Sequence, residues 1–146
     1  MKPVGDLSRL LGVTLVILMG AAAGNAQSFL SELQAEHNPV KRSNKALVLA
    51  DMAFDNARDY YNKGEVNKGD AALENMTNAL NACLQSLATA HKARFYKKAE
   101  LKVSYLQRRM EGLLYYLDVQ QRGWAEQTQR RLDAIHDKLL NGVMRK

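Results

Sequence analysis

The apolar residues between Ala99 and Leu117 recur in steps of four, three, four, three and four residues. An α-helix places residues at such steps on one face, whereas a strand would send them to both faces of a sheet. A seam of this kind packs against neighbouring helices. We therefore expect a long helix from about Phe95 to Leu117 that other helices cover. The inner seam of this helix comprises Ala99, Val103, Leu106, Met110, Leu113 and Leu117.

Three other segments repeat the helical spacing of apolar residues. The first starts at Pro39 or Ser43 and ends at Tyr61. The second begins within Glu65–Gly69, and the last covers about Trp124–Leu140. Strand signals are weak along the whole sequence, so these segments predict three further helices.

Residues that interrupt helices stand between these segments. Gly64 suits the left-handed conformation that often follows the last helical residue. The apolar spacing then breaks at Arg94 and Lys97, which predicts a turn within Thr89–Arg94. The polar stretch Asp118–Gly123 separates the last two helices. Short connections of this kind join helices into antiparallel hairpins.

A short N-terminal helix precedes Pro39 and carries Phe29, Leu30 and Leu33 on one side. It ends before the proline, because the residue ahead of a proline seldom stays helical. The sequence thus predicts an all-α fold. The architecture is a small antiparallel helical bundle of four main helices plus this short N-terminal helix.

The first 26 residues have the layout of a secretory signal. A basic start is followed by 14 residues without charge, Leu10–Ala23, and then by small residues that include Gly24 and Ala26. We expect cleavage after Ala26. The predicted organisation is therefore a cleavable signal peptide over residues 1–26 and a single helical-bundle domain over residues 27–146.

A retained membrane anchor is the alternative interpretation of this apolar run. It is shorter than the roughly 20 residues that a helix needs to span a bilayer. We therefore expect an exported protein, periplasmic or secreted, that meets the membrane only through its signal before cleavage. Cys83 is the only cysteine, so the chain cannot form an intramolecular disulfide.

Charge is distributed unevenly along the predicted domain. Residues 27–90 carry 6 basic and 8 acidic side chains, and residues 91–146 carry 13 basic and 6 acidic ones. The basic half could meet an anionic partner or complement the acidic half of the same chain. Asp51, Asp55 and Asp59 form an acidic row at helical spacing. This row could contact a basic partner, contact the chain's own basic helix, or be a solvated face.

No residue pattern of known chemistry occurs in the sequence. His37, His91 and His136 each stand alone, without a second ligand at metal spacing. Neither a nucleophile motif nor a glycine-rich phosphate loop is present. We therefore predict no cofactor, no metal site and no enzymatic activity.

A surface on the predicted helix Phe95–Leu117 is the strongest candidate for binding. Its basic residues alternate with aromatic ones, as they do in nucleic-acid-binding surfaces. An exported protein seldom meets nucleic acid, so a protein or an anionic component of the cell envelope is the expected partner. In the alternative interpretation the tyrosine rings pack inside and only the cations are solvated. The candidate residues are Arg94, Lys97, Lys98, Lys102, Tyr105, Arg108, Arg109 and Tyr115.

A second and less regular stripe of Leu101, Tyr105, Tyr115 and Val119 lies on the same helix. If the bundle leaves this stripe open, it is the first place to look for function. The sequence predicts a non-catalytic binding or scaffold module of the cell envelope that acts through this basic aromatic edge. The alternatives are a periplasmic chaperone-like holder of unfolded chains and, less favoured, an enzyme. The sequence carries no signal for the oligomeric state.

Overall fold

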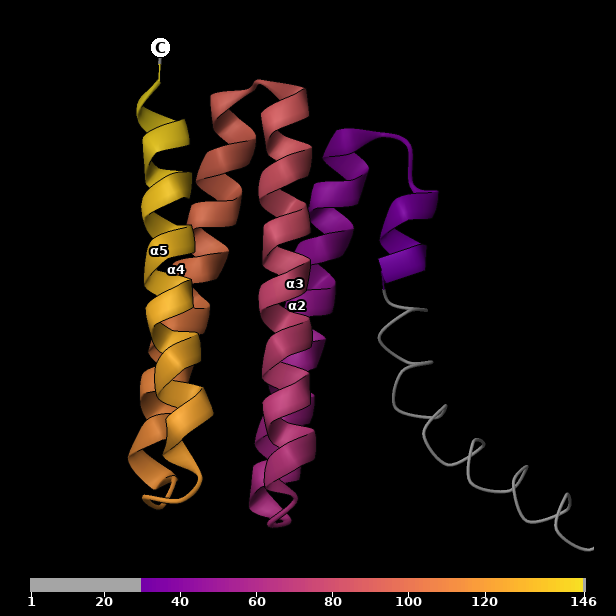
Figure 1. Cartoon of the computed structure of the whole chain (residues 1–146). Coiled ribbons are helices and arrows are strands. Elements are labelled where there is room, and N and C mark those ends of the chain that lie inside the picture. Colours follow the sequence, from indigo (N-terminus) through magenta and orange to yellow (C-terminus); the bar gives the residue numbers. More distant parts are fainter. Residues whose placement is uncertain (1–29, 146) are drawn as a thin grey trace, which may run out of the picture. The chain divides into compact units, whose positions relative to one another are not determined.

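The computed structural model describes residues 30–145, which form helices and no strand. A short helical segment covers residues 30–35, and four long helices follow it (Figure 1). The all-α prediction is confirmed, and each predicted helix lies within a few residues of its observed bounds. The long helices are α2 (Pro39–Asn62), α3 (Val66–Ala90), α4 (Ala93–Tyr116) and α5 (Arg122–Met144).

Local chemistry at the helix ends explains these bounds. The Asn38 side chain accepts hydrogen bonds from the backbone N–H groups of Val40 and Lys41, which caps the first turn of α2. Gly64 has a φ of 74° and allows the turn between α2 and α3. His91 has a φ of 51° and ends α3 in the same left-handed region.

The compact unit of the bundle comprises Leu33–Lys146. The predicted domain starts six residues earlier, at residue 27, and the predicted cleavage site lies outside the described residues. Within the compact unit, α2 packs mainly against α3, and α4 packs mainly against α5. Figure 1 shows these two antiparallel hairpins side by side.

The two hairpins meet along two further helix pairs. α3 contacts α5, and α2 contacts α4. Contacts between α2 and α4 follow the same order along both helices, from Asn44 with Lys98 to Asp55 with Arg109. These two helices therefore run in the same direction. The order around the bundle is α2, α3, α5 and α4, so the short connection between α3 and α4 crosses its diagonal.

The inner seam of α4 lies in the core, as the sequence predicts. All six of its residues are buried, and Leu73, Met76 and Leu132 are buried with them. Cys83 is also buried, and burial raises the pKa of its thiol to about 12. Among the described residues no helix is both long enough and apolar enough to cross a membrane.

Candidate functional site

Acidic residues of α2 neutralise part of the predicted basic edge. Lys102 Nζ lies 2.5 Å from Asp51 Oδ2, and Arg109 Nη2 lies 2.6 Å from Asp55 Oδ1. Two members of the acidic row therefore contact the chain's own basic helix, which was one of the three interpretations of that row. The third member, Asp59, is exposed and lies 3.9 Å from Arg58 on its own helix.

Three cations of the edge lie more than 4 Å from any carboxylate of the described chain. Arg94 stacks over the Phe95 ring at 4.7 Å, and Lys98 Nζ donates a hydrogen bond to Asn44 Oδ1 at 2.8 Å. Arg108 is exposed. Lys97, in contrast, pairs with Glu100 at 3.0 Å. The positive charge available to a partner therefore comes mainly from Arg94, Lys98 and Arg108.

The predicted second stripe is open to solvent, but its last member, Val119, lies beyond the end of α4, because the backbone becomes extended at Leu117. Leu101 is 56% exposed, Tyr105 45%, Tyr115 83% and Val119 89%. Together with the free cations it forms what we call the outer stripe, whose members recur in alternate steps of four and three. The outer stripe comprises Arg94, Lys98, Leu101, Tyr105, Arg108, Gly112, Tyr115 and Val119.

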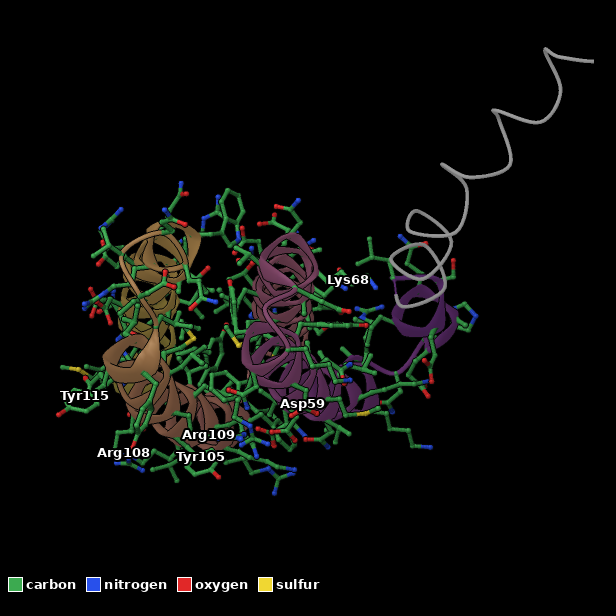
Figure 2. The ribbon with its side chains drawn as sticks, turned by 90° about the horizontal axis from the view of Figure 1, so that it is seen from below. Asp59, Lys68, Tyr105, Arg108, Arg109 and Tyr115 are labelled. Carbon is green, nitrogen blue, oxygen red and sulfur yellow. The ribbon has the colours of Figure 1, made fainter. Side chains whose placement is uncertain are left out.

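The alternative interpretation placed the rings of Tyr96 and Tyr105 inside; it is wrong for Tyr105, whereas the Tyr96 ring is half-buried against Gly142 of α5. The Tyr105 ring lies at the surface between Lys102 and Arg109, with each cation 5.5 Å from its centroid. Figure 2 shows Tyr105, Arg108 and Arg109 together along the edge of the bundle that α4 forms. Cations and aromatic rings therefore share one accessible face.

A groove of about 380 Å³ lies between α2 and α4 beside the outer stripe. Phe54, Leu113 and Tyr116 give it an apolar lining, and Arg109 stacks over the Phe54 ring at 4.3 Å. A Cβ atom added at Gly112 would meet nothing within 4 Å, so the groove stays open above this residue. The remaining lining residues are Arg58 and Asn62.

α2 extends the open face with two apolar side chains, Val48 and Met52. Each is more than half exposed. Val48 shares a helical face with Asn44 and Asp51, which contact α4, so it lies beside the seam between the two helices. The sequence analysis did not identify these residues. Val48 follows Asn44 by four residues and precedes Asp51 by three, and this helical spacing is a signal that could have identified it.

A cluster that joins α4 to α5 was also missed. His136 Nε2 lies 2.9 Å from Glu100 Oε1 and 3.1 Å from Ser104 Oγ. The Ser104 hydroxyl donates a hydrogen bond to the same Glu100 oxygen at 3.0 Å. Glu100 and Ser104 are one turn apart, but the register of α5 against α4 brings His136 to them, and the sequence does not specify that register.

The geometry of this cluster favours a structural role. In a nucleophilic relay the serine and the acid use different nitrogens of the imidazole, whereas Ser104 and Glu100 both face Nε2 of His136. Glu100 is buried, and its hydrogen bonds with His136 and Lys97 hold the pKa of its carboxyl near 2. The cluster thus keeps a buried carboxylate ionised between two helices.

The other histidines and the acidic side chains do not assemble into a metal centre. Among residues 30–145, no group of three His, Cys, Asp or Glu side chains has the arrangement to hold a metal ion. A comparison of the chain with known protein families, curated proteins and solved structures found no match. The candidate functional site is therefore the open face made by the outer stripe, the groove, Val48 and Met52.

Proposed function

We propose that this chain is a non-catalytic binding module that receives a partner protein on the open face of α4 and α2. One observation carries the proposal. The outer stripe is exposed along nearly the whole of α4, while the opposite side of the same helix is buried in the core. A surface of this kind, which combines exposed apolar and aromatic side chains with cations, is typical of an interaction site.

The composition of the face supports a protein partner. Tyrosine and arginine carry much of the binding energy at protein interfaces, and Tyr105, Arg108, Tyr115 and Tyr116 are all exposed here. Three of the basic residues are already paired with carboxylates. Pairing weakens the attraction for a polyanion, which depends on unneutralised charge. The face therefore suits a protein better than an anionic envelope polymer.

We also propose that the protein is exported, and this part of the proposal rests on the sequence pattern of residues 1–26. Cleavage after Ala26 would give a mature chain that begins at Gln27. Determination of the N-terminus and mass of the protein from fractionated cells tests this part. A mature protein that starts at Gln27 in the envelope or the medium supports it, and an intact N-terminus in the cytoplasm contradicts it.

Binding can be tested with two matched variants of the tagged protein. The first replaces Leu101, Tyr105 and Arg108 with serine on the open face. The control replaces Arg130 and Leu140, which are exposed on α5, with serine as well. Each protein is used to capture partners from an envelope extract, and any retained protein is then purified and titrated against all three chains.

The proposal predicts one retained protein that binds the unaltered chain and the α5 variant alike. The loss of three central side chains is expected to weaken its affinity at least tenfold, roughly 1.4 kcal/mol or more. A partner that binds the α4 variant and the unaltered chain equally well would contradict the proposal. So would binding that disappears in the α5 variant alone.

A second candidate function is favoured by one observation, the apolar groove beside Gly112. A holder of unfolded chains needs an apolar surface of this kind for its clients. Suppression of the aggregation of a denatured client by excess protein supports this function. Unchanged aggregation of the client contradicts it.

A further inference from the structure

We infer that the occupant of the open face is an amphipathic helix of another protein, with acidic side chains along the edge that meets α4. This inference rests on the proposed binding function and specifies the partner of the same site. Its three supports are the spacing of the outer stripe, the shape of the groove and the distribution of unpaired charge.

The spacing of the outer stripe matches helix-on-helix packing. Within α4 its residues recur in alternate steps of four and three from Arg94 to Tyr115. The same alternation lets one helix pack lengthwise against another at a small crossing angle. From Arg94 to Tyr115 the stripe is about 30 Å long, which matches an occupant helix of about 20 residues.

α2 and α4 run in the same direction, and the open face that they form could receive this occupant along its length. Val48 and Met52 are exposed on α2, and Leu101 and Tyr105 are exposed on α4. A helix laid along the seam would bury apolar side chains of both elements, which is the helix-in-groove mode of recognition. The missing side chain of Gly112 leaves room at the end of the seam for a large apolar anchor of the occupant.

The charges on the open face determine which charge the side chains of the occupant should carry. Arg58 and Arg109 beside the groove share Asp55, and Arg58 also lies 3.9 Å from Asp59, so these four side chains together carry no net charge. Among the cations of the predicted basic edge, Arg94, Lys98 and Arg108 have no carboxylate within 4 Å in the described part of the chain, and all three lie on the outer stripe. They span 14 residues, about 21 Å of α4. An occupant with acidic residues spread along one edge would complement all three.

The test titrates the full chain with three synthetic peptides of about 20 residues. The first is an amphipathic helix with glutamates along one edge. The second has lysine at each of those positions. The third contains the residues of the first in an order that abolishes the apolar face. Anionic lipid vesicles and sedimentation of the chain alone complete the measurements.

Three variants test whether binding of the peptide depends on the open face. The charge-reversal variant carries Arg94→Glu, Lys98→Glu and Arg108→Glu. Its matched control reverses three exposed cations, Arg130 and Lys138 of α5 and Arg145 directly after it. A third variant, Gly112→Trp, blocks the groove at a position where a side chain has free space, so it is expected to fold.

We expect the acidic amphipathic peptide to bind about tenfold more tightly than either other peptide. The affinity is expected to fall at least tenfold in the α4 reversal and in Gly112→Trp, and to change less than about twofold in the α5 reversal. Higher salt is expected to weaken this binding because the charges on the stripe are exposed.

Four results would overturn the inference. They are no binding of the acidic peptide, equal binding of the reordered peptide, equally tight and stripe-dependent binding of vesicles, and a dimer of this chain that the α4 reversal dissociates. If the peptides fail while a captured protein still requires Leu101 and Tyr105, the proposed function stands and only the nature of the occupant is wrong. If both experiments fail, the proposed function is wrong as well.

Discussion

Glu100 is the only charged residue among the buried side chains of the described chain. A buried carboxylate is costly unless it is paired and hydrogen-bonded. His136, Lys97 and Ser104 all lie within 3.0 Å of its oxygens and meet this need. The loss of these interactions would leave an unpaired polar cluster between α4 and α5, so stability is expected to depend on the charge of one residue.

This dependence predicts a specific response to acid. The folded pKa of Glu100 is about 2, below its ordinary value of 4.5. Its contribution to the free energy of unfolding is therefore complete above pH 4.5 and is lost as the pH falls towards 2. Glu100→Gln is expected to lower the free energy of unfolding by about 1–3 kcal/mol at pH 7.

Urea unfolding at a series of pH values measures this effect. The difference between the unaltered chain and Glu100→Gln is expected to shrink as the pH falls towards 2. Glu111→Gln is the matched control, because Glu111 is exposed on the same helix. A difference that stays constant from pH 7 to pH 2 would show that the charge of Glu100 does not stabilise the fold.

His91 predicts a gain of stability from a single substitution. It adopts a φ of 51°, which costs about 1 kcal/mol for a residue with a Cβ atom. His91→Gly is therefore expected to raise the free energy of unfolding by about 1 kcal/mol. At Gly64, with a φ of 74°, the change to Ala is expected to lower it by a similar amount. A shift of the urea midpoint in the opposite direction at either residue would contradict this explanation.

The interface between α2 and α4 contains two acid–base pairs, Asp51 with Lys102 and Asp55 with Arg109. These side chains are part-exposed, so each pair is expected to contribute little stability by itself. Their arrangement places basic residues of α4 against the acidic row of α2 and helps to position α4 beside α2.

A double-mutant cycle on Asp51 and Lys102 tests this view of the interface. Alanine at both positions, singly and together, is expected to give a coupling energy of about 1 kcal/mol in urea unfolding. The pair is about one third exposed, so high salt is expected to reduce the coupling. A coupling energy of zero would mean that the pair does not position α4.

Gly112 predicts that α4 can be stabilised without repacking. A Cβ atom there would meet no neighbour, so Gly112→Ala gains helix propensity of up to about 1 kcal/mol at no steric cost. The melting temperature is expected to rise by about 4 °C. Gly142→Ala is the control, because its Cβ would overlap the Tyr96 ring. Destabilisation by both changes would contradict the open space above Gly112.

The sequence predicted the helices well because each has a buried face whose spacing is local information. The inner seam of α4 and the break near His91 both follow from residues within one or two turns. The role of Asp51 and Asp55 was one of several open interpretations, since it depends on which helix lies beside α2. The groove and the cluster at His136 could not be predicted, because both require the register between helices far apart in the sequence.

In the bundle as a whole, many charges are paired between the two halves of the chain, whereas exposed residues on one side of α4 remain available. The acidic first half supplies partners to the basic second half, so much of the charge imbalance in the sequence is satisfied internally. What is left is a face with free cations and exposed rings on one side of α4. This combination suits specific docking better than general attraction to polyanions.

We propose that the open face of α4 contacts a partner while the other exposed positions of α4 do not. A photoreactive side chain introduced at each position of α4 in turn, in living cells, tests this proposal. We predict that crosslinking to one protein peaks at Leu101, Tyr105, Arg108 and Tyr115, and is absent at exposed Glu111 on the same helix. Crosslinks without this periodicity, or none at the four outer positions, would contradict the proposal.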